Sequence, residues 1–468
     1  MKVVFIHYHL LKGGVTTVLR RQVQALLKSG DQVLVLAGEA DEPSFEGAPP
    51  VLLDALRYDG RREPGQQVED LAGDILKAIR ARFPDGVDIV HIHNPLIRKN
   101  SLFLPALALL QREGLRLFLQ NHDFAEDWRP DVWVGDGPYP GNCHYAVING
   151  RDREYLVKAG LKPKAVHLLP NPVLAPPLGE ARERNLFLYP VRAIRRKNIG
   201  EILLLSLFLS GGCRIGVTLP PTSEKDVPMY RFWRETAARL SLPVAFDLGL
   251  DADFGALVAS SRAIITTSVK EGFGFSFLEP WLASRPVLGR RIDYVCRDFE
   301  GEGMVFNELY DGIDIPLEYF DSGELEARFT AALDQVWELF GRSTPPQARR
   351  SLLESLFSRG VIDFGRLDEE LQAMILGRLS KDDAMRRDLS ALNPFLAALP
   401  DWQENEALTA QNRATVVRSW SPEATLHILK NAWQESIDSP CHQHPDREAL
   451  LHAFLDPAKL SLAGTGYD

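Results

Sequence analysis

The first 37 residues hold the pattern that most limits the fold of this chain. An apolar, β-rich run at residues 2–7 (KVVFIH) leads to the glycine pair Gly13 and Gly14, and residues 15–29 then have helical apolar spacing. Residues 32–37 (QVLVLA) have the character of the next strand. A strand, a glycine turn, a helix and a second strand form a βαβ unit, whose two strands are parallel. The opening therefore predicts an α/β fold.

The same alternation continues along two thirds of the chain. We expect strands at residues 87–92, 115–119, 144–148 and 165–169, with helices at 101–113 and 152–159. A second series has strands at 186–189, 214–218, 244–247, 263–267 and 286–288, and helices at 199–209, 227–240, 254–260 and 275–283. These strands are apolar without alternation, as is typical of a parallel sheet covered on both faces. Two successive α/β sheets with one hinge between them are predicted, with a cleft at the carboxyl ends of their strands.

Prolines and charges mark the boundary between the two series. Four prolines between residues 170 and 177, followed by charged residues 180–184, form the best linker. We therefore predict an N-terminal domain at 1–175 and a second domain at 176–409. Helices are expected at 325–339, 349–357, 367–379, 382–399 and 425–435, with 341–403 as a helical insertion. Residues 410–468 are expected to form a closing helix that returns toward the first domain, and a polar tail.

The composition excludes several classes of protein. Lys plus Arg number 53 against 63 Asp plus Glu, for a formal charge of −10. This balance argues against a nucleic-acid-wrapping protein or one that lies broadly on an anionic membrane, although a local basic patch stays open. Four well-separated cysteines form no CxxC pair, and no leader or membrane-length apolar run occurs. We therefore expect a cytoplasmic protein without a transmembrane segment.

A cationic loop follows the first strand of the second series. Arg192, Arg195, Arg196 and Lys197 fall within six residues at the carboxyl end of that strand. A diphosphate is a natural counterpart, because arginine binds phosphate bidentately and lysine adds a point charge. The alternative is a solvated charged loop. The turn at Gly13 and Gly14 favours an anion in the same way, although any βα turn favours glycine.

A pair of carboxylates follows the strand predicted at 263–267. Glu271 and Glu279 stand eight residues apart in EGFGFSFLEP, which separates them by about 12 Å if the segment is helical. That distance exceeds the roughly 5–9.5 Å of paired-carboxylate hydrolases. It suits the two ends of one extended ligand, and sugar hydroxyls are suitable partners for shielded carboxylates. The predicted helix start at Gly274 and Phe275 would offer a second anion site; the alternative is a capped surface helix.

EGFGFSFLEP resembles the E-x7-E motif of the family-four retaining glycosyltransferases. Six further segments resemble motifs of that family in the same order: KGGV (12–15), VDIVHIHNP (87–95), LQNHDF (119–124), LLPNPV (168–173), VRAIRRKNIGEIL (191–203) and NRATVVRSWSPEATLHIL (412–429). The resemblance covers roughly residues 1–429. It implies the GT-B architecture, with two facing Rossmann-like domains and a nucleotide-diphosphate-sugar donor held mainly by the second.

The resemblance also implies roles for individual residues. Arg192 and Lys197 would neutralise the donor diphosphate, Glu271 would bind hexose hydroxyls, and Glu279 would bind the ribose. His122 would contact the sugar near its C6 hydroxyl. The implied donor contacts further include Gly13, Gly14, Asn171, Gly272, Phe273, Gly274 and Phe275. No cofactor or metal is expected, and the implied reaction is front-face displacement with retention, in which the leaving phosphate helps to deprotonate the acceptor.

Some segments depart from the family pattern. Pro172 stands where the family has glycine, so that turn must run differently. Arg290 and Arg291 replace a glycine pair, and the sequence leaves open whether they lie on the surface or reach a ligand. The long loop at residues 123–142 is a candidate acceptor lid, whose Trp128, Trp133 and Tyr139 either stack on a sugar or pack.

Other functions remain open at this stage. A GT-B disaccharide phosphorylase and a non-catalytic nucleotide- or glycan-binding protein share the expected fold, whereas a dehydrogenase is disfavoured because no GxGxxG occurs. Histidine pairs at residues 7 and 9 and at 91 and 93 are read as strand-end pocket lining rather than metal ligands. We expect the acceptor to be a hydroxyl of a soluble sugar or small molecule. The nucleotide (UDP, GDP or ADP), the hexose and the oligomeric state are left open.

Overall fold

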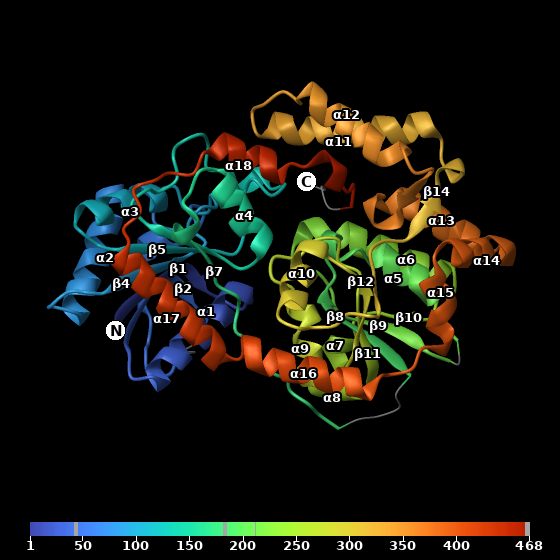
Figure 1. The fold of residues 1–468 in the computed structure, drawn as a ribbon, viewed down its shortest axis with the longest axis horizontal. Helices are drawn as coiled ribbons and strands as arrows, with labels where there is room; N and C mark the ends of the chain where they lie inside the picture. The colour runs from blue at the N-terminus through green and yellow to red at the C-terminus, as the bar shows by residue number, and fades with distance from the viewer. Residues whose placement is uncertain (42–44, 181–184, 211, 464–468) are drawn as a thin grey trace. The chain divides into compact units, whose positions relative to one another are not determined.

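The computed structural model describes residues 1–41, 45–180, 185–210 and 212–463, and Figure 1 shows its ribbon. The chain divides into two compact units. The first comprises Met1–Val173 and Arg418–Leu455, and the second comprises Leu174–Val417 and the residues from Asp456 onward. Residues 181–184 of the predicted linker lie outside the described residues.

The first unit contains a parallel seven-stranded sheet in the order β3-β2-β1-β4-β5-β6-β7. Its strands are β1 (Lys2–Leu10), β2 (Gln32–Ala40), β3 (Val51–Leu52), β4 (Ile89–His93), β5 (Leu117–Asn121), β6 (His144–Val147) and β7 (Val166–Leu168). Its helices are α1 (Gly14–Lys28), α2 (Val68–Arg82), α3 (Phe103–Arg112), α4 (Gly150–Lys158), α17 (Pro422–Asp438) and α18 (Arg447–Phe454). The predicted βαβ opening is confirmed, because β1 pairs with β2 in parallel across α1.

Two apolar cores cover the two faces of this sheet. Val3 and Phe5 of β1 belong to the core that includes residues of α1 and α17, and α17 packs on α1. Val4 and Ile6 belong to the other core, to which α2, α3, α4 and α18 contribute. Successive residues of a strand point to opposite faces, so an apolar run without alternation is what a sheet covered on both sides requires.

The second unit contains a parallel six-stranded sheet in the order β10-β9-β8-β11-β12-β13. Its strands are β8 (Leu186–Arg192), β9 (Arg214–Leu219), β10 (Val244–Ala245), β11 (Ser261–Thr266), β12 (Val287–Arg290) and β13 (Leu309–Tyr310). The helices around them are α5 (Ile199–Ser206), α6 (Val227–Arg239), α7 (Leu248–Asp251), α8 (Phe254–Ser260), α9 (Glu279–Leu282) and α10 (Asp293–Gly301). β8 and β11 are neighbours, so their carboxyl ends lie side by side.

The rest of the second unit is helical apart from one small sheet. Its helices are α11 (Ser322–Leu339), α12 (Pro346–Phe357), α13 (Glu369–Leu379), α14 (Asp383–Leu392), α15 (Pro394–Ala398) and α16 (Glu406–Trp420). The predicted insertion at 341–403 also carries a strand that the sequence did not indicate. This strand, β15 (Val361–Asp363), pairs antiparallel with β14 (Asp314–Pro316) and so ties the insertion to the segment before it.

Proline breaks one helix that the sequence predicts as continuous. The helix expected at 382–399 is α14 and α15, divided at Asn393 and Pro394. The helix expected at 425–435 lies within α17, where Ser421 caps the helix and Pro422 is in its first turn. Proline suits the start of a helix and disrupts its interior. α16 carries the chain from the second unit into the first, at Val417 and Arg418.

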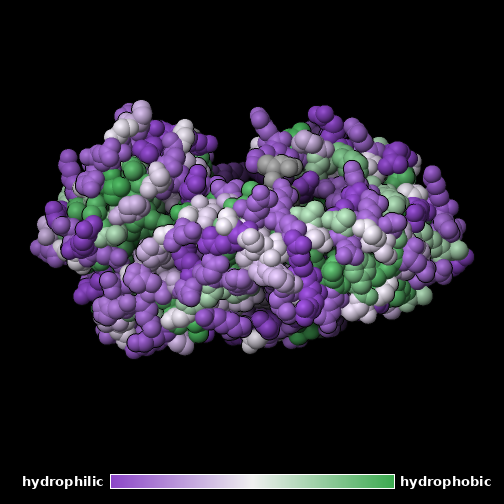
Figure 2. Space-filling model, turned by 90° about the horizontal axis from the view of Figure 1, so that it is seen from above, coloured by the Kyte–Doolittle hydropathy of each residue, from purple (hydrophilic) through white to green (hydrophobic). Residues whose placement is uncertain are grey.

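The polar tail is more ordered than its composition indicates. It contains α18, whose Leu450 and Phe454 belong to the core of the first unit. No helix of the described residues combines the length and the apolar character that crossing a membrane requires. The face seen in Figure 2 is mainly hydrophilic, with smaller hydrophobic areas.

Candidate functional site

The cationic loop and the first carboxylate of E-x7-E meet in the second unit. β8 ends at Arg192, a short 3-10 helix (Arg195–Lys197) follows, and Glu271 lies in the loop after the adjacent strand β11. Lys197 Nζ contacts Glu271 Oε1, and Arg196 Nη1 donates to Glu271 Oε2 at 3.0 Å. Arg196 also donates to the carbonyl of Lys270 at 2.9 Å. The sheet thus brings together residues separated by more than 70 positions.

The contact between Lys197 and Glu271 is buried, and it shifts the pKa values of both groups. Glu271 is 9% exposed. Burial acts to raise the pKa of Glu271, but Lys197 and Arg196 outweigh it and lower this pKa to about 2. Burial also lowers the pKa of Lys197, and Glu271 opposes that shift. A carboxylate that stays ionised in a shielded place is an acceptor for several hydrogen bonds.

The four cations of the loop differ in their partners. Arg196 and Lys197 share Glu271, while Arg195 pairs with Glu369 of α13 at 2.8 Å. The guanidinium of Arg192, which is half-buried, has no hydrogen-bond or ion-pair partner among the residues that the structure describes. Arg192 therefore adds a positive charge beside the pairs that Glu271 and Glu369 make, and this charge favours an anion at the carboxyl end of this sheet.

The segment after Glu271 differs from the predicted helix at 275–283. Gly274 is left-handed (φ 88°), only Phe275–Phe277 form a 3-10 helix, and α9 begins at Glu279. Pro280, which lacks the N–H that a helix interior uses, separates the 3-10 turn from α9. Glu279 thus starts a four-residue helix instead of lying one or two turns inside one, and the second anion site expected at Gly274 has too short a helix to carry a useful dipole.

The aromatic residues of this segment pack. Phe273 is buried and makes edge-on contacts with Phe275 and Phe299. Phe277 is fully buried. Tyr294 of α10 bonds the backbone of Glu271, donating to its carbonyl and accepting from its N–H at 3.3 Å. The backbone that carries Glu271 is therefore held by a neighbouring helix, while Gly272 is partly exposed beside it.

In the first unit, the glycine turn has an open environment. Gly13 caps α1 and Gly14 is its first residue. A Cβ at Gly14 would meet no atom within 4 Å, and one at Gly13 would meet only Leu11 O at 3.9 Å. The backbone of Gly13 is extended (φ −179°), which any residue adopts. Neither the backbone nor the neighbouring atoms require glycine at these positions. Close approach of an anion to the helix N-terminus would require it.

His122 lies directly after β5 and contacts a second histidine. Its Nε2 lies 2.9 Å from Nδ1 of His93, the last residue of β4, and its backbone N–H donates to Asn94 Oδ1 at 2.6 Å. Burial lowers the pKa of His122 to about 4 and the pKa of His93 well below its ordinary value. Two neutral imidazoles that share one hydrogen bond must have one donor and one acceptor.

The surroundings of the pair decide between the two tautomers. Nε2 of His93 is buried without a partner in the described part of the chain. Because an orphaned buried N–H is rarer than an under-used acceptor, we assign the proton of His93 to Nδ1, which donates to His122. His122 then carries its proton on Nδ1 and can donate it to a ligand. The sequence reasoning treated His93 as pocket lining and missed this positioning contact, although HIH beside LQNHDF was a usable signal.

Buried neutral histidines make the stability of the first unit depend on pH. Burial lowers the pKa of His7 and His91 to about 3, and that of His122 and His167 to about 4. The unfolded chain binds protons near pH 6.5, so between pH 6.5 and 4 it binds more protons than the folded chain. We expect the free energy of unfolding to fall as the pH falls through this window, by up to about 1.4 kcal/mol per pH unit for each histidine. Urea unfolding at pH 7.5 and 5.5 tests this, and His122→Asn should reduce the slope; equal midpoints at the two pH values would contradict it.

Asn171 and the aromatic residues of the predicted lid also lie in the first unit. Asn171 is buried, and its Oδ1 has no partner among the described residues.

The aromatic residues of the predicted lid at 123–142 contact other parts of the first unit. Arg447 of α18 lies 3.9 Å from the ring centre of Trp133 and 4.0 Å from that of Tyr139. Tyr139 also donates to the buried Glu126 at 2.8 Å. Trp128 is buried as well. These aromatic residues therefore pack, and the alternative of sugar stacking is not supported.

Arg290 and Arg291 both bind carboxylates of the chain. Arg290 is buried at the end of β12, bonded to Glu201 and Asp363, and Arg291 donates to Glu300 at 2.7 Å. The sequence placed them in a loop after residue 288, but β12 runs to Arg290. Of the two alternatives left open by the sequence, ligand contact has no support, and Arg290 is not a surface residue either.

Comparison with known proteins shows what this chain is similar to. Residues 12–174 match the sequence model of Glycosyltransferase Family 4. A mannosylglucosyl-3-phosphoglycerate synthase from Petrotoga mobilis is 25% identical over 445 residues, which cover 87% of this chain and 85% of that protein. The chain is similar to family 4 glycosyltransferases.

Solved structures of glycosyltransferases have the same fold as this chain. HepE from Anabaena, in complex with UDP and glucose, superposes with a TM-score of 0.54 at 12% identity and covers 93% of this chain and 99% of its own. A glycosyltransferase from Rickettsia africae has a TM-score of 0.51 at 12% identity, with 94% and 99% covered. Together with the two parallel sheets, these likenesses assign the chain to the GT-B fold and confirm the predicted fold class.

Proposed function

We propose that the protein is a family 4 glycosyltransferase that moves a hexose from a nucleotide-diphosphate sugar to a hydroxyl acceptor, with retention of anomeric configuration. The second unit is proposed to bind the donor, with Arg192 and Lys197 on the diphosphate, Glu271 on the hexose and Glu279 on the ribose. The first unit is proposed to bind the acceptor at the carboxyl end of its sheet, where His122 and the turn at Gly13 and Gly14 lie.

The observation that carries this proposal is the charge arrangement around Glu271. A shielded, ionised carboxylate suits sugar hydroxyls, and the cations of the neighbouring loop suit a diphosphate. Arg192 can bind a phosphate without first breaking an ion pair. A diphosphate and a hydroxyl-rich group joined in one ligand match these two features at adjacent places.

The Lys197–Glu271 pair indicates how the donor is received. We propose that the diphosphate replaces Glu271 as the partner of Lys197, while sugar hydroxyls replace Lys197 as partners of Glu271. Each charge is then paired both before and after binding, so neither is left buried and alone. As the sugar–phosphate bond breaks, Arg192 and Lys197 stabilise the charge that grows on the departing diphosphate, so we propose that transfer requires no metal.

For the acceptor, we propose a soluble small molecule that carries an acidic group. The support is the relative from Petrotoga mobilis, whose name describes a product containing 3-phosphoglycerate. Lysines are present at the proposed acceptor end of the first unit: Lys12 follows β1, and Lys99 Nζ lies 5.7 Å from the ring centre of Tyr58. Either could meet a phosphate or a carboxylate as a point charge.

A turnover panel tests the function. UDP-, GDP- and ADP-sugars are each incubated with a glycosyl phosphoglycerate or its dephosphorylated form, with and without a chelator. We expect one donor class to release nucleoside diphosphate, a product with the donor's anomeric configuration, faster reaction with the phosphorylated acceptor, and no effect of the chelator. A reaction that depends on inorganic phosphate would instead identify a phosphorylase. Nucleotide binding without any product would identify a binding protein.

A further inference from the structure

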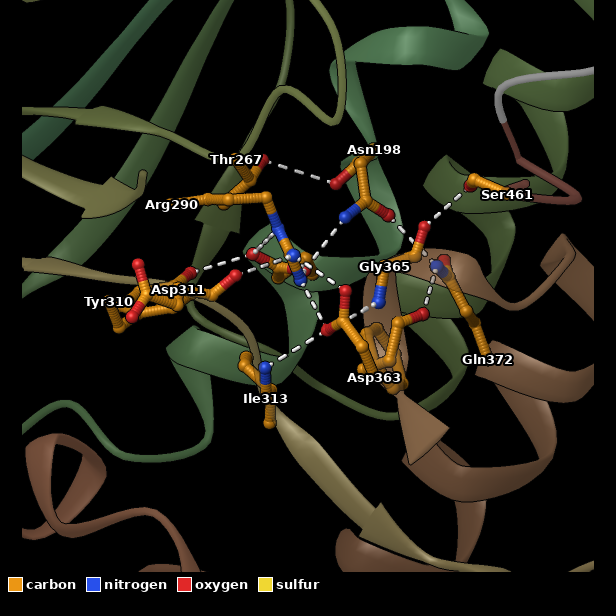
Figure 3. Close-up of polar contacts among 12 residues, drawn as sticks. Asn198, Thr267, Arg290, Tyr310, Asp311, Ile313, Asp363, Gly365, Gln372 and Ser461 are labelled. Atoms are coloured by element: carbon orange, nitrogen blue, oxygen red, sulfur yellow. Dashed lines mark hydrogen bonds and ion pairs between the residues drawn. The ribbon is translucent and has the colours of Figure 1, made fainter. Parts of the chain in front are cut away.

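A chain of buried polar residues connects the insertion to the cationic loop, and Figure 3 shows it. At its centre, Arg290 Nε donates to Glu201 Oε1 at 3.0 Å, while Nη1 and Nη2 donate to the two oxygens of Asp363 at 2.7 and 2.8 Å. Glu201 lies in the first turn of α5, and Asp363 ends β15 within the insertion. The guanidinium thus joins the sheet, a helix and the insertion.

The remaining acceptors of this cluster are also satisfied. Tyr310 donates to Glu201 Oε1 at 2.7 Å, and Asn198 Nδ2 donates to Glu201 Oε2 at 2.8 Å. The backbone N–H groups of Ile313 and Gly365 donate to Asp363 Oδ1 at 3.0 and 3.2 Å. One guanidinium and two carboxylates leave a net negative charge in a buried place, which these donors compensate.

Two glycines provide room for the chain. A Cβ at Gly365 would collide with the guanidinium of Arg290, and one at Gly200 would collide with Oε1 of Gln372. Larger side chains at either position would push the polar groups apart. The close approach of these groups therefore depends on the glycines.

The chain ends at the turn that carries Lys197. Gln372 of α13 donates from Nε2 to Asn198 Oδ1 at 2.9 Å and to the carbonyl of Phe364 at 3.0 Å. Asn198, directly after Lys197, has a left-handed backbone (φ 51°, ψ 59°). A non-glycine residue in that conformation persists only when its surroundings fix it. Gln372 and Glu201 hold its side chain from two directions.

The backbone of Lys197 is fixed as well. Its carbonyl accepts from Tyr189 at 2.8 Å and from Thr267 Oγ1 at 3.0 Å. Thr267 also donates to the carbonyl of Asn198 at 3.2 Å. The turn that carries Lys197 is thus hydrogen-bonded to the sheet on one side and to the insertion on the other. These bonds fix the direction of the Lys197 side chain.

We propose that the insertion positions the donor-binding lysine, Lys197, by holding its turn in the binding conformation. Gln372 acts on this turn through Asn198. Asp363 acts on it through Arg290 and Glu201. This inference rests on the proposed function, because it assigns the insertion a task in donor binding. Gln372 and Arg290 are positioning residues, since their polar groups are occupied by protein partners.

The test replaces Gln372 by methionine, which has a similar shape and no amide. We expect the kcat/KM for the nucleotide sugar to fall about 10-fold through a higher donor KM, with the acceptor KM unchanged. In the unliganded chain, Lys197 should be reductively methylated several-fold faster, as measured by mass spectrometry. Glu370→Gln is the matched control on the same helix, because it removes only an exposed contact to Arg328.

A second variant separates positioning from general stability. Asn198→Gly removes the side chain through which Gln372 acts, so adding Gln372→Met to Asn198→Gly should cause little further loss of kcat/KM. A lower melting temperature in Gln372→Met, with donor KM and Lys197 labelling unchanged, would overturn the proposal. If the parent chain turns over no nucleotide sugar, the proposed function fails, and the labelling rates still decide whether Gln372 holds the turn.

Discussion

Replacing Glu271 by glutamine lowers the rate of hexose transfer by at least about 100-fold, because the proposed acceptor of the sugar hydroxyls loses its charge. Lys197 then has no carboxylate partner at that position. We therefore expect kcat to fall as well. A neutral amide binds the hydroxyls less strongly than a carboxylate does, and it does not neutralise the charge of Lys197 before the donor binds. Steady-state kinetics with the donor found in the turnover panel measure it.

The control for this variant is Glu300→Gln. It breaks another partly buried arginine–carboxylate pair of the second unit, with Arg291, outside the cationic loop. We expect it to retain activity, and thermal unfolding to show both variants folded. Glu271→Gln with the parent kcat and KM would remove Glu271 from the donor site.

Replacing Arg192 by alanine weakens binding of the nucleoside diphosphate about 10- to 100-fold, the range of one charge-assisted hydrogen-bond contact. Because no described residue pairs with its guanidinium, the free energy of unfolding should change by no more than about 0.5 kcal/mol. Isothermal titration at low and high salt measures the affinity, and the salt dependence should be smaller in the variant because one phosphate contact is gone.

Arg297→Ala is the matched control for Arg192→Ala. Arg297 is an exposed arginine on α10, in the same unit and outside the cationic loop. Its removal lowers the net charge by the same amount, so a general charge effect would weaken binding in both variants. Equal loss in the two would argue against a specific contact of Arg192 with the diphosphate.

The sequence predicts the parts of the fold whose causes are local. The βαβ opening follows from apolar spacing and a glycine turn within one short segment, and the parallel sheets follow from strands that are apolar throughout. The continuous helix expected at 275–283 was wrong for an equally local reason, since Pro280 divides it into a 3-10 turn and α9. That proline could have been weighed against the periodicity.

Contacts between distant residues are harder to predict. Arg290 finds Glu201 and Asp363 at separations of 89 and 73 residues, so its burial cannot be read from its neighbours. The same holds for Arg447, whose aromatic partners lie about 310 residues earlier in the chain. The sequence also did not predict that Lys197 pairs with Glu271. It assigned Lys197 to the diphosphate and Glu271 to the hexose, and so gave no reason to expect a direct contact between them.

A crystal structure of the protein with an unhydrolysed nucleotide sugar tests the central claim most directly. We predict that the diphosphate lies within hydrogen-bond distance of Arg192 and Lys197, that Lys197 Nζ has left Glu271, and that sugar hydroxyls donate to the freed carboxylate. A nucleotide sugar bound elsewhere, with the Lys197–Glu271 pair intact, would contradict this account.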